Sequence, residues 1–171
     1  ENSRNLSHVI RVEILPTSPF AFDSTVHKPD HFPSADCRWE PGRRWQTMLW
    51  QGESLGLILE NVGSLDAPRI SLHLYSERSL ADSFVNGLVQ EIEYRCNLRL
   101  DLQGFYDAVG DDALLSPVLR RFCGLRPMHP GSLYEYLVIA IVLQNATVRR
   151  SVNMMQALFE KYGTLLQFDG K

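Results

Sequence analysis

This sequence has no long apolar run, few cysteines and only a small excess of one sign of charge. The longest apolar stretch, residues 136–143, is far shorter than the roughly 20 residues that cross a bilayer, so we expect no membrane segment. The three cysteines, Cys37, Cys96 and Cys123, are odd in number and widely spaced. This pattern argues against a disulfide framework and for a reducing compartment.

The formal net charge is −3, which excludes a polycation that holds nucleic acid by bulk attraction. Residues 101–171 contain seven basic and seven acidic residues, so the acidic excess lies entirely in the first 100 residues. Any contact with a polyanion must therefore be local.

Patterns typical of metal sites and nucleophiles are also scarce. His27, His31 and Cys37 have the spacing of possible ligands, but zinc sites usually show paired short spacings and no second pair follows. Cys123 stands in an apolar helical pattern, which is typical of a small buried side chain rather than of a nucleophile. The sequence predicts no metal site and no cofactor.

The first half of the chain has the two-residue period of β-strands. Residues 8–14 partly alternate and 69–75 alternate cleanly, while 45–50 and 55–61 flank a turn at 51–54. Short strands that follow one another without helices between them predict an antiparallel sheet.

The second half has a helical period. Ser79 is expected to cap a first helix. The stripe that this helix should bury consists of Leu80, Phe84, Leu88, Ile92 and Cys96. Two short helices are expected around 102–109 and 115–122, ended by Gly110 and Gly124.

The next predicted helix is apolar almost all round. Ser132 and Glu135 form a capping box at its start, and Leu137 and Ile141 belong to its apolar body. A helix without a polar face belongs in the middle of a bundle, so both of these side chains are expected to be buried. A last helix follows and ends at Gly163.

These patterns predict an α+β protein. A small antiparallel sheet domain with one packed helix is expected over residues 1–98, and the first helices of an α-helical domain over residues 99–171. The apolar core helix needs more neighbours than these residues supply. We therefore expect four helices of an incomplete bundle, with an exposed helical face that dimerisation would cover.

The junction before the last helix carries an unusual choice of residues. Arg149 and Arg150 stand in the first turn, where the helix dipole is positive and paired cations cost stability. Such a choice indicates an anionic partner, because free backbone N–H groups, the dipole and two guanidinium groups together suit a phosphate. The alternative is that both arginines extend into solvent or pair with carboxylates elsewhere.

Gln144 and Asn145 lie at the same junction. Side chains of this length, beside a phosphate-binding helix end, can enter a duplex and fill the gap that an extruded base leaves. The alternative is that one of them caps the last helix, a role that Asn performs well.

Several motifs share their order and spacing with one family. They are FCGLRPM at 122–128, IVLQNATVRR at 141–150, YG at 162–163, CRW at 37–39 before Trp45, and NLRLDL at 97–102 before Phe105 and Tyr106. Together they resemble the helix-hairpin-helix DNA glycosylases of the 8-oxoguanine and alkylpurine types. The resemblance covers nearly the whole chain.

In that family the residue matching Asn145 wedges into the duplex where the damaged base leaves, and the one matching Arg150 contacts the orphaned partner base. Gln144 and Arg149 lie beside them. The resemblance implies double-stranded DNA with a damaged base as the partner, and a cytoplasmic, nucleoid-associated or nuclear location. Oxidised-guanine glycosylases carry a run of asparagines where this sequence has NAT at 145–147, so the damaged purine, oxidised or alkylated, stays open.

The resemblance also implies an enzyme, a DNA N-glycosylase of base-excision repair whose sheet domain is like the TATA-binding protein. The family's helix-hairpin-helix and catalytic Asp would lie beyond Lys171. The sequence is then expected to be an N-terminal portion without a catalytic residue, inactive by itself. A lyase step stays open. The alternatives are a non-catalytic DNA- or protein-binding module and a structural interaction domain.

Overall fold

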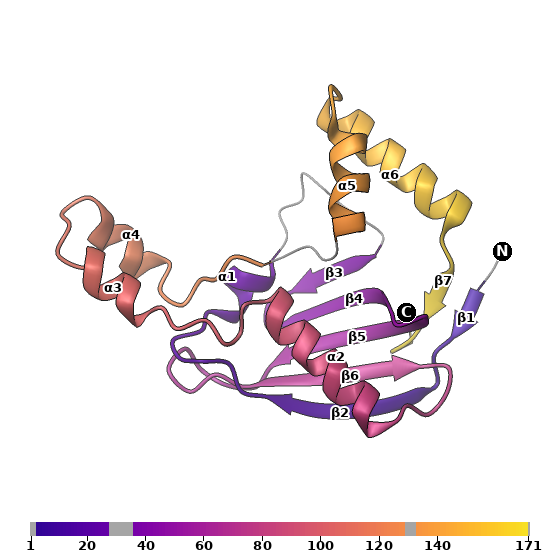
Figure 1. Ribbon diagram of the computed structural model, residues 1–171, viewed down its shortest axis with the longest axis horizontal. Helices are drawn as coiled ribbons and strands as arrows, with labels where there is room; N and C mark the ends of the chain where they lie inside the picture. The colour runs from indigo at the N-terminus through magenta and orange to yellow at the C-terminus, as the bar shows by residue number, and fades with distance from the viewer. Residues whose placement is uncertain (1–2, 28–35, 129–132, 171) are drawn as a thin grey trace.

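The computed structural model describes residues 3–27, 36–128 and 133–170, and its first half is built on a five-stranded antiparallel sheet (Figure 1). In the spatial order β2-β6-β5-β4-β3, the strands are β2 (His8–Ile14), β6 (Ile70–Ser76), β5 (Glu53–Asn61), β4 (Arg43–Trp50) and β3 (Cys37–Glu40). The predicted antiparallel sheet is confirmed, because each strand runs opposite to its neighbours.

A tight hairpin joins β4 to β5. Gln51 (φ 47°) and Gly52 (φ 82°) both adopt left-handed backbone angles, as the central residues of a type I′ turn do. The turn is shorter than predicted, because Glu53 already pairs with Trp50. The sequence pattern gave no bounds for β3, since four residues are too few to show the two-residue period.

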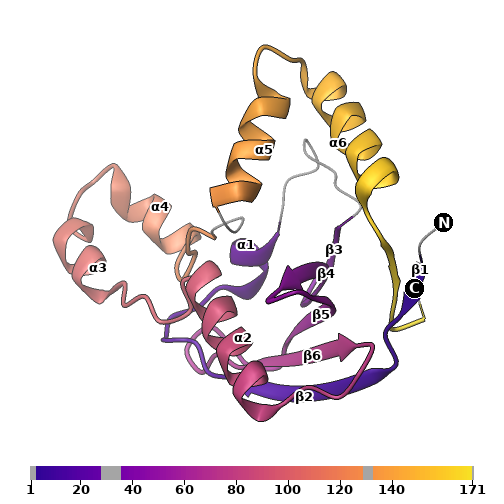
Figure 2. The same ribbon diagram turned by 45° about the vertical axis from the view of Figure 1, so that its right-hand side comes forward.

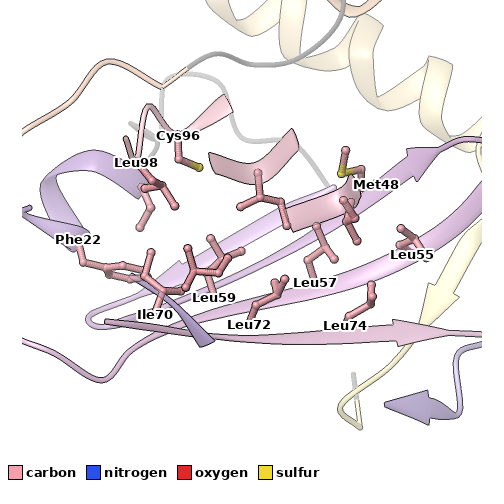
Figure 3. Packing of buried hydrophobic residues seen from close by; sticks show 14 of the residues in the cluster. Phe22, Met48, Leu55, Leu57, Leu59, Ile70, Leu72, Leu74, Cys96 and Leu98 are labelled. Carbon is pink, nitrogen blue, oxygen red and sulfur yellow. The ribbon is translucent and has the colours of Figure 1, made fainter. Parts of the chain in front are cut away.

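The hydrophobic core lies between one face of the sheet and α2 (Asp82–Arg95), which crosses that face (Figure 1). Leucines at alternate positions of β5 and β6 point to this face, as the period of two requires. Figure 3 shows them gathered with Met48, Cys96 and Leu98. The single helix predicted to cover the sheet is therefore α2.

The stripe predicted for this helix faces the core. Its buried members are Leu88, Ile92 and Cys96, and its partly buried members are Leu80 and Phe84. The predicted cap at Ser79 is wrong, because the N-cap is Ala81, whose carbonyl accepts the first helical bond from the N–H of Val85 at 3.1 Å. An ion pair between Arg78 and Glu53 links the connection before α2 to β5.

A short helix that the sequence pattern did not indicate, α1 (Phe22–Val26), closes one end of the core. Phe22 and Val26 are buried in it. Arg44 on β4 donates from Nη1 to the carbonyl of Val26 at 2.5 Å. The end of α1 is therefore tied directly to the sheet.

The predicted helices of the second half are present, but they do not form one bundle. α3 (Gln103–Val109) and α4 (Leu115–Arg121) make one hairpin, and α5 (Leu133–Leu143) and α6 (Val148–Tyr162) make another. Figures 1 and 2 show the two hairpins projecting in different directions from the sheet. The expectation of a single four-helix bundle is therefore wrong for the described residues.

The predicted burial of Leu137 and Ile141 is also wrong, because these side chains are 53% and 68% exposed. α5 and α6 contact each other but diverge from their connecting turn (Figure 2), and Val142 is the one buried residue of α5 among those that the structure describes. An apolar pattern around a whole helix leads to burial only where further helices surround it. Ser132, the predicted cap of this helix, lies outside the described residues.

Glycine ends two of these helices as predicted. Gly110 and Gly163 occupy the C-cap positions of α3 and α6. α4 instead ends with Phe122 as the C-cap, and Gly124 follows two residues later with a φ of 77°. In the described part of the chain, no helix has the length and apolarity to cross a membrane.

A second, two-stranded sheet links the beginning of the chain to its second half. β1 (Ser3–Asn5) pairs in parallel with β7 (Leu165–Gln167), which follows α6. The chain thus returns across the boundary predicted between residues 1–98 and 99–171. That boundary stays a prediction.

A buried arginine joins the two halves of the molecule. Arg126 is 1% exposed, and its Nη1 donates to the carbonyls of Asn97 (2.9 Å) and Leu98 (2.7 Å), just after α2. Its Nη2 donates to the carbonyls of Thr17 and Pro19 (3.1 Å), just after β2. One guanidinium group therefore holds three connections together: those after β2, after α2 and after α4.

Truncating a core leucine should be far more costly than truncating the apolar helix face. We expect Leu72→Ala to lower the free energy of unfolding by about 2–5 kcal/mol, because it leaves a cavity under α2. Leu137→Ala is the matched control and should change it by less than about 0.5 kcal/mol. Urea titrations measure both. A large loss at Leu137 would show that this face is covered in solution.

Removing the guanidinium group of Arg126 should destabilise the protein. We expect Arg126→Met to lower the free energy of unfolding by about 2–4 kcal/mol, because four carbonyls lose a charged donor. Arg126→Lys should lose nearly as much, since an ammonium group cannot span both pairs of carbonyls. Arg120→Met, on the exposed end of α4, is the control. Equal losses for Arg126→Met and Arg120→Met would contradict the role assigned to Arg126.

Candidate nucleic-acid interface

The four residues predicted to meet DNA lie together at the tip of the α5–α6 hairpin, defined here as residues 144–150. Gln144, Asn145, Arg149 and Arg150 are all exposed. Figure 1 shows this tip at the end of the hairpin that points away from the sheet. The four residues, which are close in the sequence, thus form one compact, protruding surface.

The turn at the tip holds Asn145 in an unusual conformation. The N–H of Gln144 donates to the carbonyl of Ile141 (3.3 Å), and the N–H of Ala146 donates to that of Leu143 (3.4 Å). Between them, Asn145 has a φ of 51°, in the left-handed region that Asn adopts more readily than other non-glycine residues. Backbone in sparsely populated regions clusters at functional sites.

Asn145 does not cap α6, so that alternative is wrong. The N-cap is Thr147, whose Oγ1 accepts from the N–H of Arg150 at 3.3 Å and whose carbonyl accepts from the N–H of Ser151 at 2.9 Å. Asn145 lies two residues earlier, outside the helix. The sequence did contain this signal, because Thr is itself a preferred cap, but Asn145 masked it.

The two arginines occupy the first turn of α6, with no acidic residue in that turn. Among the ion pairs of the described residues, none involves Arg149 or Arg150. Both positive charges therefore add to the positive end of the helix dipole, which favours a nearby anion.

Ser151, whose importance the sequence did not reveal, lies just behind the tip. It is 1% exposed and its Oγ has no hydrogen-bond partner in the described part of the chain. Val142 and Ser151 are the buried residues of α5 and α6. A small side chain at this level suits a close approach of the two helices next to the tip.

The other residues weighed for chemistry have structural surroundings. In the described residues no group of three His, Cys, Asp or Glu side chains could hold a metal ion. The His27 ring packs against Trp39, tilted by 41° with ring centroids 4.4 Å apart, and His31 lies outside the described residues. Burial raises the pKa of the Cys96 thiol to about 11, so this cysteine stays neutral and unreactive near pH 7.

Comparison with solved structures identifies a DNA glycosylase-like fold. One matching structure is the 3-methyladenine DNA-glycosylase from Archaeoglobus fulgidus, with a TM-score of 0.73 and 12% sequence identity. The match covers 94% of this chain and 53% of that chain, so this chain spans about half the length of that structure. It confirms the predicted α+β fold class and, at this identity, shows the fold alone. The sequence matches no protein-family model and no curated protein.

Stability measurements should separate the cap from the exposed turn. Thr147→Ala should lower the free energy of unfolding by about 1 kcal/mol, because the N–H of Arg150 loses its acceptor. Asn145→Gly keeps the left-handed backbone and should change it by less than about 0.5 kcal/mol. Arg150→Ala should leave it unchanged or slightly raised, since a cation leaves the positive helix end. A larger loss for Asn145→Gly than for Thr147→Ala would restore Asn145 as a structural residue.

Proposed function

We propose that this chain is the DNA-engaging part of a DNA N-glycosylase that extrudes a damaged purine from double-stranded DNA. The observation that carries the proposal is the hairpin tip. It presents an exposed, left-handed Asn145 beside two arginines at a positive helix end, on a glycosylase-like fold. The arginines oppose the helix dipole, and the exposed side chain of Asn145 extends from a turn whose backbone terminates α5, so each has a role at a duplex.

The arginines are assigned to the DNA backbone and the partner base. The first N–H groups of α6, its dipole and the guanidinium group of Arg149 together favour a phosphate. Arg150, by its resemblance to oxidised-guanine glycosylases, is assigned to the base left without a partner. A base contact gives preference among partner bases, whereas a phosphate contact gives salt-dependent affinity.

Asn145 is assigned to the gap in the duplex, with Gln144 beside it. Removing a base from the stack costs a few kcal/mol in lost pairing and stacking. A polar side chain that enters the gap offsets part of this cost and slows the return of the base. Because the protein fixes the backbone of Asn145 before DNA arrives, little ordering entropy remains to be lost on binding.

The chemistry of bond cleavage is assigned to another part of the intact protein. No acidic residue occurs between Glu135 and Glu160, so the tip has no carboxylate to stabilise an oxocarbenium-like charge. We propose that a helix-hairpin-helix with a catalytic Asp, beyond Lys171, completes the enzyme. An oxidised or alkylated purine as substrate, an accompanying lyase step and a cytoplasmic or nuclear location are further parts of this proposal.

A non-catalytic DNA- or protein-binding module is the second candidate. Exposed apolar side chains on the helical hairpins support it, above all Leu114 (85%) and Tyr134 (75%), since a partner or a second copy of the chain can cover such a surface. Excision of alkylated or oxidised bases by the intact protein would support the glycosylase, and its absence would support the module.

Two variants should separate DNA binding from base extrusion. Arg150→Ala should weaken duplex binding, and it should lower the salt slope of the affinity by about one if the arginine contacts a phosphate. Asn145→Gly should leave that slope unchanged but reduce base extrusion, because a neutral side chain releases no counterions. Anisotropy titrations at several salt concentrations measure the first effect, and the fluorescence of 2-aminopurine in the duplex measures the second.

Lys161→Ala is the matched control for charge, since Lys161 is an exposed cation at the other end of α6. It should bind duplex DNA like the unmodified chain. If Arg150→Ala and Lys161→Ala weaken binding equally, the hairpin tip has no special role. If Asn145→Gly gives the same 2-aminopurine signal as the unmodified chain, the wedge assignment is wrong.

A further inference from the structure

The face of the sheet opposite α2 carries a second, polar set of contacts. Trp45 of β4 lies opposite Ile58 of β5, and both are buried although no part of the main core covers them. The segment that follows α6 crosses this face. Two of its residues, Phe168 and Asp169, touch three adjacent strands and are called the latch here.

The ring of Phe168 occupies a place that only glycine leaves open. A Cβ added at Gly56, in the middle of β5, would lie 2.6 Å from Cγ of Phe168. The same ring packs against Tyr75 of β6, with ring centroids 5.3 Å apart and an interplanar angle of 46°. The absent side chain at Gly56 and the phenyl ring are therefore complementary in shape.

The carboxylate of Asp169 is bound by side chains from two strands. Its Oδ2 accepts from the indole Nε1 of Trp45 (3.0 Å) and lies 3.4 Å from Nη2 of Arg43, both on β4. Its Oδ1 accepts from the hydroxyl of Tyr75 (3.4 Å) on β6. The guanidinium group of Arg43 also stacks over the Trp45 ring, 4.7 Å from its centroid. The Phe168 ring and the Asp169 carboxylate, from consecutive residues, are thus each held by several contacts with the sheet.

Backbone pairing reinforces the latch. β7 runs parallel to β1, and the N–H of Leu6 donates to the carbonyl of Gln167 at 2.9 Å. Leu6 is itself buried, at 2% exposure. The segment after α6 is therefore anchored continuously from Leu165 to Asp169.

We propose that Phe168 and Asp169 are positioning residues that fix the direction of α6 against the sheet and so place the hairpin tip on DNA. The inference rests on the function proposed above. The other foot of the hairpin is held near α2, where Nη1 of Arg95 lies 3.6 Å from Oε2 of Glu135. α5 and α6 are thus fixed at their feet, and the tip is at the far end of both.

Because α6 is long, a small change in its direction at the latch moves the hairpin tip by several ångströms. Its 15 residues span roughly 22 Å at about 1.5 Å per residue, so a tilt of about 10° at the foot displaces the tip by roughly 4 Å. Errors of about 1 Å in the placement of reacting groups already reduce catalytic rates strongly. A latch on the sheet therefore controls the precision of a wedge that it does not touch.

The variant Gly56→Ala tests the latch, because the added methyl group displaces the Phe168 ring without reaching the core under α2. Gly104→Ala is the matched control, since the same methyl group on α3 meets no atom within 4 Å. Hydrogen exchange of peptides covering residues 3–6 and 164–168 should become about tenfold faster or more in Gly56→Ala. Peptides from α2 should keep their protection, and Gly104→Ala should resemble the unmodified chain at residues 3–6 and 164–168.

A second variant distinguishes the latch from damage to the sheet. Phe168→Ala should give the same loss of protection as Gly56→Ala, and the double variant should be no worse than either single one, because both remove the same contact. An additive loss would show that Gly56→Ala harms the sheet itself and would overturn the latch. Unchanged protection in both single variants would overturn it as well.

DNA binding tests the positioning role separately. In Gly56→Ala and Phe168→Ala the duplex affinity and the 2-aminopurine signal should fall, while the salt slope stays the same because Arg149 and Arg150 are intact. Lost protection with unchanged affinity and extrusion would overturn the positioning role. If the unmodified chain does not bind duplex DNA at all, the proposed function fails, while the exchange measurements still decide whether the latch exists.

Discussion

The relative placement of the two halves depends on one buried guanidinium group. Among the described residues, Arg126 has no carboxylate as a hydrogen-bond partner and instead donates to four main-chain carbonyls, two after β2 and two after α2. Burial lowers the pKa of Arg126, but an arginine stays charged, so the cost of its desolvation must be offset by these carbonyls. They are correctly placed only when both connections are folded. The charge therefore makes the junction specific, because another arrangement of the connections would leave it without partners.

The junction at Arg126 and the latch act on opposite feet of the same hairpin. Arg126 and Arg95 fix the chain shortly before and within α5, whereas Phe168 and Asp169 fix it after α6. Neither foot approaches residues 144–150. A protruding helical hairpin with most of its apolar surface exposed can still hold its tip in place, provided that both feet are bound by groups with strict geometry. The hydrogen bonds of the Arg126 guanidinium group and the packing of the Phe168 ring on Gly56 meet that requirement. Contacts between aliphatic side chains have no comparable directional preference.

Sequence periodicity was sufficient for the elements that are defined by their own residues. Alternating leucines in β5 and β6 and the helical stripe of α2 match the structure, because the period of a strand or helix is a local property. β1 and β7 have three residues each and exist only because Ser3 meets Leu165, which no local pattern shows. The apolar pattern at Leu137 was detected correctly, but burial depends on neighbours that a helix cannot specify alone. The burial of Arg126 runs against the usual exposure of its residue type.

At the site, sequence reasoning located Arg149 and Arg150 correctly at the start of a helix, while their role at DNA stays a prediction. Two arginines at a positive helix end were visible in the sequence, and the structure leaves them exposed. The sequence alone could not decide whether Asn145 or Thr147 caps α6, because both residue types cap helices well. Only the backbone angle distinguishes the two. That angle places Asn145 just beyond the end of α5, where a left-handed residue commonly terminates a helix, so its backbone has a structural role and its exposed side chain remains free for a partner. Residues that satisfy neither propensity nor electrostatics are the ones that sequence rules are expected to misjudge at functional sites. Here Arg149 and Arg150 oppose the helix dipole at one protruding tip, and the first turn of α6 holds no acidic residue to offset them, so this helix end favours a nearby anion.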